Sequence, residues 1–203
     1  MIYLASDIHL EFFKKSSVDK ITKLIENKVN KQVDNYLILA GDVCVVNHEN
    51  FDHFFKNIQK LFKKIFYVLG NHEYYQSDIQ TTKNLVSKKI NVLNKNNDNI
   101  ILLDNSTHYL EELDILLVGT TLWSDLTYNN KDITLAKYMV NDFNLINNYT
   151  TKDYQKSHME CLEFIKKQIE LHKNKRILMI THHMPSYEFI DRKYKDSDMN
   201  ICF

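Results

Sequence analysis

Glycine, proline and cysteine are scarce in this sequence. The 203 residues include only three glycines, one proline and three cysteines. Three scattered cysteines cannot build a disulfide framework, and none lies close enough to another in the sequence to form a Cys-Cys zinc pair. We therefore expect reduced thiols, with Cys44 as a small buried hydrophobic residue.

The sequence also lacks a net charge and a long hydrophobic run. Basic and acidic residues both number 26, so no overall field attracts nucleic acid or an anionic membrane. The longest apolar runs are far too short to span a bilayer. An apolar run already starts at residue 2, which leaves no room for a signal peptide, and we expect a cytoplasmic protein.

The hydrophobic content is nevertheless sufficient for a folded core. Hydrophobic residues make up 44% of the chain, a proportion typical of globular proteins. Because no internal repeat or linker divides the chain, we expect residues 1–203 to form one domain.

Four apolar runs each end in a short polar motif. The runs cover residues 2–5, 36–40, 65–69 and 177–180 and are rich in strand formers. Runs that are apolar throughout, rather than alternating, are typical of strands buried on both faces. Ligands gather at the carboxyl ends of such strands, where the motifs lie. The motifs are Asp7-Ile8-His9, Gly41-Asp42, Gly70-Asn71-His72-Glu73 and Thr181-His182-His183.

Amphipathic segments between the runs predict helices. Apolar residues recur at helical spacing over residues 18–29, 51–62 and 78–93. Strands that alternate with helices favour a parallel sheet with helical crossovers. Further along, the capping-box pattern Thr150-x-x-Asp153 predicts the start of a long helix that ends near Asn174.

Short strand candidates follow the third of these helices, at residues 100–103, 107–110 and 115–118. Connections of so few residues suit hairpins, so we expect an antiparallel second sheet in this region. The chain as a whole is therefore predicted to have an α/β fold.

The first two motifs contain side chains suited to metal binding. Asp7 and His9 are two residues apart, so at an extended strand end they point to the same side. A carboxylate with an imidazole suits Mn, Fe or Zn better than Ca. Gly41 allows close approach of the backbone, so the carboxylate of Asp42 can bridge two ions. Alone, each motif is a weak signal, because Asp-x-His occurs by chance and Gly-Asp is a common turn.

The third and fourth motifs strengthen this interpretation. Asn71 offers a neutral oxygen ligand, and His72 beside it can face a bound substrate. His182 adds an imidazole after a buried strand, although a lone histidine there is more often structural. The four motifs agree in type, order and position, which independent coincidences rarely produce.

In these motifs and their order, the sequence resembles the calcineurin-like metallophosphoesterases. Further matches to a subgroup of small phosphatase-like members extend the resemblance over essentially the whole chain. They cover residues 6–11, 39–44, 70–75, 119–125, 141–143 and 181–186. The resemblance implies an α/β fold in which a β-sandwich of two mixed sheets is flanked by helices, in αββα layers.

The resemblance also implies a centre of two divalent ions, with Mn, Fe or Zn as candidates, and a phosphate ester as substrate. One ion would be held by Asp7, His9 and Asp42, and the other by Asp42, Asn71 and His182. Two ions about 3.5 to 4 Å apart would lower the pKa of a bridging water, whose hydroxide attacks phosphorus in line. His72 would stabilise the transition state or protonate the leaving oxygen.

Several neighbouring residues have open roles. His183 could replace His182 as the ligand, although we place His182 first, or it could contact the phosphate together with Asn71. Glu73 is expected to orient His72 or its loop. Three aromatic residues could line a substrate cleft or could pack beneath the core, namely Trp123, Tyr74 and Tyr75.

The chain departs from the family at one point, because the fifth family motif, Gly-His-x-His, is absent. Its two histidines complete the two metal shells in the family, so each ion would keep three protein ligands here. Fewer ligands weaken binding but need not abolish it. A stop codon or frameshift, an N-terminal fragment, or histidines from a neighbouring chain would each explain the absence. We expect a domain truncated at its C-terminus, with an unpaired sheet edge and self-association.

Two functions are compatible with these observations. The first is a metal-dependent phosphoesterase, possessing either phosphomonoesterase or phosphodiesterase activity, and the set of polar strand-end residues favours it. The second is a non-catalytic remnant or binding module that retains the fold, and the missing motif favours it. The substrate and the physiological metal stay open at this stage.

Overall fold

The first three apolar runs form neighbouring strands of one sheet. The computed structural model of the protein describes residues 1–95, 97–127, 133–194, 197 and 200. The sheet has the order β1-β2-β3-β4, and every neighbouring pair is parallel. Its strands are β1 (Ile2–Ala5), β2 (Tyr36–Ala40), β3 (Lys64–Val68) and β4 (Ile100–Leu102).

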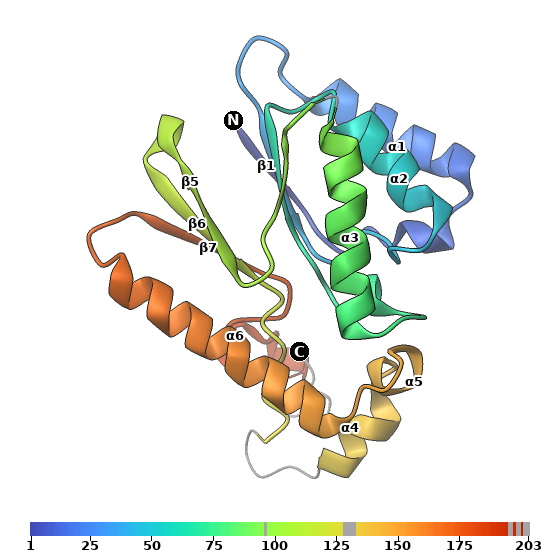
Figure 1. Ribbon diagram of the computed structural model, residues 1–203, viewed down its shortest axis with the longest axis vertical. Coiled ribbons are helices and arrows are strands. Elements are labelled where there is room, and N and C mark those ends of the chain that lie inside the picture. Colours follow the sequence, from blue (N-terminus) through green and yellow to red (C-terminus); the bar gives the residue numbers. More distant parts are fainter. Residues whose placement is uncertain (96, 128–132, 195–196, 198–199, 201–203) are drawn as a thin grey trace.

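Three helices connect these strands and cover one face of the sheet (Figure 1). They are α1 (Lys15–Lys28), α2 (Glu49–Ile58) and α3 (Ile79–Asn94). Side chains alternate along β2, as strand geometry requires. Leu37 and Leu39 belong to the core beneath the helices, whereas Ile38 belongs to a second core on the other face.

The second sheet packs on that other face. It contains β5 (Ser106–Leu110), β6 (Ile115–Thr120) and β7 (Ile177–Thr181), with β5 and β6 antiparallel and β6 and β7 parallel. Phe66 of the first sheet and Leu117 of the second share the core between the sheets. The long helix α6 (Thr151–Leu171) lies along the outside of the second sheet (Figure 1). The α/β fold in αββα layers is therefore confirmed.

Two details differ from the sequence prediction. Residues 100–102 do not open the antiparallel sheet, because α3 returns the chain so that β4 pairs in parallel with β3. The first sheet is consequently parallel throughout its described strands rather than mixed. Only β5 and β6 form the predicted hairpin, with the short 3-10 helix η3 (Glu111–Leu113) between them.

The capping box predicted at Thr150 is confirmed. The backbone N–H of Asp153 donates to Oγ1 of Thr150, and Oδ2 of Asp153 accepts from the backbone N–H of Thr150 at 2.9 Å. These bonds satisfy backbone donors that a helix start leaves free. The remaining elements are α4 (Ile133–Met139), α5 (Asp142–Leu145), η1 (Leu10–Phe12), η2 (His72–Tyr74), η5 (Tyr187–Phe189) and η6 (Arg192–Tyr194).

The edge strands are β1 and β4 in the first sheet and β5 and β7 in the second. Within the described part of the chain, β1 pairs with β2 alone and β7 pairs with β6 alone. On β1, Tyr3 packs against the helix-side core, but Leu4 faces the opposite way and is 70% exposed. One edge of the sandwich therefore leaves apolar surface uncovered.

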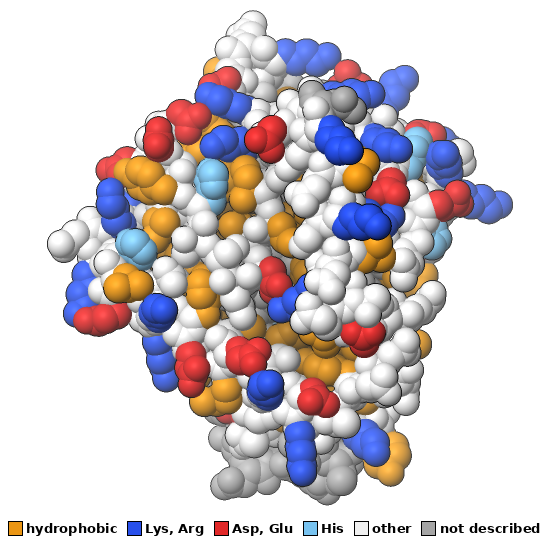
Figure 2. Space-filling view, in the orientation of Figure 1, with side chains coloured by type: hydrophobic (Ala, Val, Ile, Leu, Met, Phe, Trp, Pro, Cys, Tyr) orange, Lys and Arg blue, Asp and Glu red, His pale blue; other side chains and the backbone are white. Residues whose placement is uncertain are grey.

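Charged side chains of both signs are intermixed over the face shown in Figure 2. This distribution agrees with the balanced composition of the sequence. Among the described helices, none has both the length and the apolar character that a membrane span requires.

Candidate metal centre

The loops that follow β1 and β2 are held against each other by backbone hydrogen bonds. The N–H of Asp7 donates to the carbonyl of Gly41 at 3.1 Å, and the N–H of His9 donates to the carbonyl of Asp42 at 3.0 Å. Asp7, His9 and Asp42 all have positive φ angles, between 50° and 53°. Non-glycine residues adopt this left-handed conformation rarely, and such strain is concentrated at functional sites.

Two glycines provide the space that the cluster needs. A Cβ atom on Gly70 would lie 2.2 Å from Oδ1 of Asp42 and 2.8 Å from Nε2 of His182. A Cβ atom on Gly41 would lie 2.4 Å from Nδ1 of His182. Any larger residue at either position would displace these side chains, so two of the three glycines in the sequence are explained by the site.

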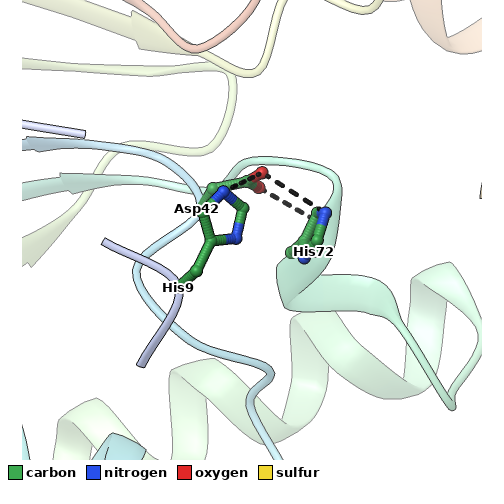
Figure 3. Close-up of side chains that lie close together, drawn as sticks. All are labelled: His9, Asp42 and His72. Carbon is green, nitrogen blue, oxygen red and sulfur yellow. Dashed lines mark hydrogen bonds and ion pairs between the residues drawn. The ribbon is translucent and has the colours of Figure 1, made fainter. Parts of the chain in front are cut away.

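Asp42 lies at the centre of the predicted residues. Ligand atoms of Asp7, Asp42 and His182 lie within 4.8 Å of one another, and the same holds for His9, Asp42 and His72. Figure 3 shows the two histidine rings of the second group converging on the Asp42 carboxylate. The structure thus brings together side chains from all four motifs, and Asp42 is common to both groups.

Asn71, from the third motif, joins the cluster through His182. Oδ1 of Asn71 lies 3.1 Å from Nε2 of His182. Nδ1 of the same ring lies 3.0 Å from the backbone carbonyl of Ala40, which can only accept, so Nδ1 carries the proton. Nε2 is then free to bind a cation, an arrangement typical of metal-ligating histidines.

His72 is oriented by Glu11 rather than by Glu73. Nδ1 of His72 donates to Oε1 of Glu11 at 2.9 Å, and its Nε2 lies 3.8 Å from Oδ2 of Asp42. Burial raises the pKa of Glu11, but the hydrogen bond and the charge of His72, with a smaller contribution from His9, hold it below its ordinary value. Glu11 therefore stays an acceptor, which fixes the His72 proton on Nδ1 and leaves Nε2 facing the cluster.

Glu73 does not orient His72. Its carboxylate connects the loop after β2 with the loop after β3. It is 1% exposed and accepts hydrogen bonds from the backbone N–H groups of residues 42–44 and of Gly70, and from the hydroxyl of Tyr67. The prediction that Glu73 orients its loop is confirmed in this form. Cys44 lies in the same loop as a buried free thiol, as expected, and burial raises its pKa.

The electrostatics of the cluster suit a divalent cation. Asp42 is 4% exposed, and among the described residues neither Asp42 nor Asp7 forms an ion pair with lysine or arginine. Burial, with the carboxylate charge of Glu73 nearby, raises the pKa of Asp42 to about 9. A bound cation would supply the missing positive charge and keep the carboxylate ionised. Oxygen and imidazole donors together fit Mn, Fe or Zn.

The cluster forms the floor of an open pocket of about 540 Å³. Val140, Met184 and Pro185 contribute apolar wall, and Thr181 and Asp142 contribute polar wall. A pocket of this size accommodates a small ligand above the metal-binding side chains.

His183 lines the same pocket but lies outside both candidate ligand groups. It is 7% exposed, and its ring packs against Trp123 with the centroids 5.6 Å apart. Burial and the neighbouring His182 lower the pKa of His183 well below its ordinary value, so the ring is neutral near pH 7. Between the two histidines of the fourth motif, it is His182 that approaches Asp42.

The aromatic residues divide between core and site. Trp123 and Tyr74 are buried and pack against each other, with centroids 5.8 Å apart. Tyr75 instead stacks on His72, with centroids 4.2 Å apart, and its hydroxyl donates to Asp142. Tyr75, predicted to line a cleft or pack beneath the core, lies at the site, where it is joined by Asp142 and Glu11, for which the motifs alone gave no role. All three lie in segments through which the family resemblance extends.

Comparison with known proteins identifies the family. The family model for calcineurin-like phosphoesterases matches residues 1–201. The chain belongs to the calcineurin-like phosphoesterases. This metallophosphoesterase family is metal-dependent and hydrolyses phosphate esters, so the resemblance seen in the motifs is confirmed.

Two individual proteins are similar to this phosphoesterase. Uncharacterized protein L509 of Acanthamoeba polyphaga mimivirus is 32% identical over 193 residues, which cover 90% of this chain and 67% of that protein. The crystal structure of the phosphopantetheinyl hydrolase PptH from Mycobacterium tuberculosis superposes with a TM-score of 0.66 at 16% identity. That match covers 91% of this chain and 68% of the hydrolase, and it shows a common fold.

The raised pKa of Asp42 predicts how pH affects the stability of the metal-free phosphoesterase. The pKa of the Asp42 carboxyl group is about 9 in the folded protein and 3.8 in the unfolded protein. As the pH rises between these values, the ionisation of this group lowers the free energy of unfolding. Asp42→Asn removes this effect. We expect Asp42→Asn to be more stable than the wild type at pH 8 by at least about 1 kcal/mol, and to lose less stability between pH 5 and 9.

Urea unfolding in the presence of EDTA at pH 5, 7 and 9 measures both quantities. Asp34→Asn is the matched control, because Asp34 is exposed and lies before β2, at the opposite end of the strand from Asp42. Equal pH slopes for the wild type and Asp42→Asn would contradict the prediction.

Proposed function

We propose that the protein hydrolyses phosphate esters at a centre of two divalent ions that share the carboxylate of Asp42. The observation that carries this proposal is the position of Asp42, which belongs to both groups of candidate ligands, with Oδ2 nearer His9 and Oδ1 nearer His182. By the order of the family motifs, Asp7 and His9 would complete the site of one ion, and Asn71 and His182 the site of the other. The structure instead places Asp7 nearer His182, and His9 nearer His72. When bound, two such ions supply Lewis acidity and activate water near neutral pH.

The residues around this centre have roles that their contacts support. His72 presents Nε2 to the pocket. Its doubly protonated form, which the Glu11 carboxylate at Nδ1 stabilises, can give the Nε2 proton to the leaving oxygen of the ester. The stacked ring of Tyr75 restricts the orientation of His72. His183 is a neutral side chain in the pocket wall and can donate to a phosphate oxygen. Asn71 was also predicted to contact the phosphate, but its amide nitrogen donates to Asp142 and Tyr75 instead.

The identity of the ions and the extent of the domain belong to this proposal as well. Manganese is our first choice, with iron and zinc as alternatives, because the donor set mixes carboxylate, amide oxygen and imidazole. Residues 1–203 are proposed to form one domain. We propose a cytoplasmic location.

Hydrolysis of aryl phosphates with added Mn²⁺ tests the proposal. Para-nitrophenyl phosphate and bis-para-nitrophenyl phosphate distinguish monoesterase from diesterase activity. We expect His72→Ala to lower kcat by about 10²- to 10⁴-fold, because it removes the proton donor, and Asp42→Asn to abolish turnover with loss of Mn²⁺ binding. His172→Ala, at the C-terminal cap of α6, is the control and should retain full activity.

A folded protein that binds Mn²⁺ but hydrolyses neither substrate would favour the alternative of a non-catalytic binding module. A folded protein with neither metal binding nor turnover would refute the proposed chemistry altogether.

We also propose that the protein associates with itself through the open edge of the sandwich. β1 has backbone groups along an edge that the described chain leaves unpaired, and Leu4 beside them is 70% exposed. Unpaired edges with apolar side chains are prone to pair with other chains, and a lysine placed on the edge opposes such pairing.

Leu4→Lys is therefore expected to lower the average mass of the protein in solution toward that of the monomer, as measured by sedimentation velocity over a concentration series. Leu24→Lys is the matched control, because Leu24 is 62% exposed on α1, away from the edge. A wild-type protein that stays monomeric at the highest concentration would disprove self-association.

A further inference from the structure

The amide of Asn71 has two different ends, and only one of them can bind a metal. Its Oδ1 lies 3.1 Å from Nε2 of His182, on the side of the candidate cluster. Its Nδ2 points the other way and donates to Asp142 at 2.7 Å and to Tyr75 at 3.1 Å. An amide turned by 180° would present N–H groups to the cation, and such groups cannot act as ligands.

The hydrogen bonds among these residues permit one orientation of the amide. Oδ1 of Asp142 accepts from Nδ2 of Asn71 and from the hydroxyl of Tyr75, the latter at 2.8 Å. Because the Tyr75 hydroxyl gives its single proton to Asp142, its oxygen faces Asn71 as an acceptor. Both partners of the Asn71 amide therefore require its nitrogen, and the oxygen must face the cluster.

The element that contributes Asp142 is firmly attached to the Asn71 loop. The N–H of Gln76 donates to the carbonyl of Leu145 at 2.7 Å, and the N–H of Asn147 donates to the carbonyl of Ser77 at 2.8 Å. Both bonds lie just C-terminal to the Asp142 contact in each of the two segments. Backbone pairing thus fixes the distance between α5 and the loop after β3.

The burial of Asp142 indicates that its hydrogen bond with Asn71 does more than stabilise the fold. The residue is 1% exposed, and within the described chain it forms no ion pair with lysine or arginine. Removing a carboxylate from water is costly unless hydrogen bonds or nearby cations compensate. An apolar side chain would fill the position at lower cost, but it could not orient an amide.

We propose that Asp142, together with Tyr75, is a positioning residue that holds the Asn71 amide with its oxygen toward the ion shared with Asp42 and His182. This inference rests on the proposed two-metal function and adds a residue to it. Asp142 itself does not act as a ligand in this role.

A double-mutant cycle with Mn²⁺ as the only probe tests the inference. Free Mn²⁺ is measured by electron paramagnetic resonance during titration of the metal-free protein. Asp142→Ala should weaken binding at the Asn71 position by about 10- to 100-fold, the usual effect of losing a partner that orients a metal ligand. Asp34→Ala, at the far end of β2, is the control and should bind like the wild type.

The second arm of the cycle separates orientation from structural support. In an Asn71→Asp background, the side chain presents an oxygen whichever way it turns, so it needs no orienting acceptor. Asp142→Ala should then leave Mn²⁺ affinity unchanged or raise it, since it also removes a like charge. A structural role for Asp142 would lower affinity in both backgrounds.

Tyr75→Phe provides an independent variant if Asp142→Ala folds poorly. It keeps the ring on His72 and removes only the hydroxyl, so we expect a smaller loss of Mn²⁺ affinity in the same direction, with unchanged thermal unfolding of the metal-free protein. A wild type that binds Mn²⁺ with an affinity that neither variant alters would overturn this inference alone. A wild type that binds no Mn²⁺ would overturn the proposed function and this inference together.

Discussion

The buried carboxylate of Glu73 is the interaction on which the rest of the site depends. All of its hydrogen-bond partners are donors, and they come from the loop after β2, from the loop after β3 and from Tyr67 within β3. An amide at this position would place N–H groups against some of these donors. By joining the two loops, Glu73 brings Asp42 next to the backbone N–H of His72, which donates to Oδ1 of Asp42 at 2.9 Å.

The same arrangement leaves the site under electrostatic and conformational strain. Glu73 and Asp42 are both buried, and their proximity helps to raise the pKa of Asp42. Asp7, His9 and Asp42 have left-handed backbone conformations, which the paired loops maintain. A divalent cation between these side chains would relieve the charge repulsion, and the backbone strain is then part of a prearranged binding site. Membership of a metal-dependent hydrolase family agrees with this account.

Much of the fold and the centre of the site could be predicted from the sequence, because both depend on local patterns. Apolar runs and helical periodicity gave the strands and helices, and the strand-end motifs gave Asp42 and its neighbours. The parallel pairing of residues 100–102 with β3 was not predicted, because the sequence of a three-residue strand does not indicate which strand it pairs with. Glu11 and Asp142 contact residues 61 and 71 positions away, and such side-chain contacts leave no periodic trace in one sequence.

We propose above all that the carboxylate of Asp42 bridges two ions. Anomalous X-ray diffraction from crystals of the protein saturated with Mn²⁺ tests it most directly. We expect two anomalous peaks about 3.5 to 4 Å apart, one on each side of the Asp42 carboxylate, with the Asn71 oxygen directed at one of them. A single peak, or manganese bound away from Asp42, would contradict it.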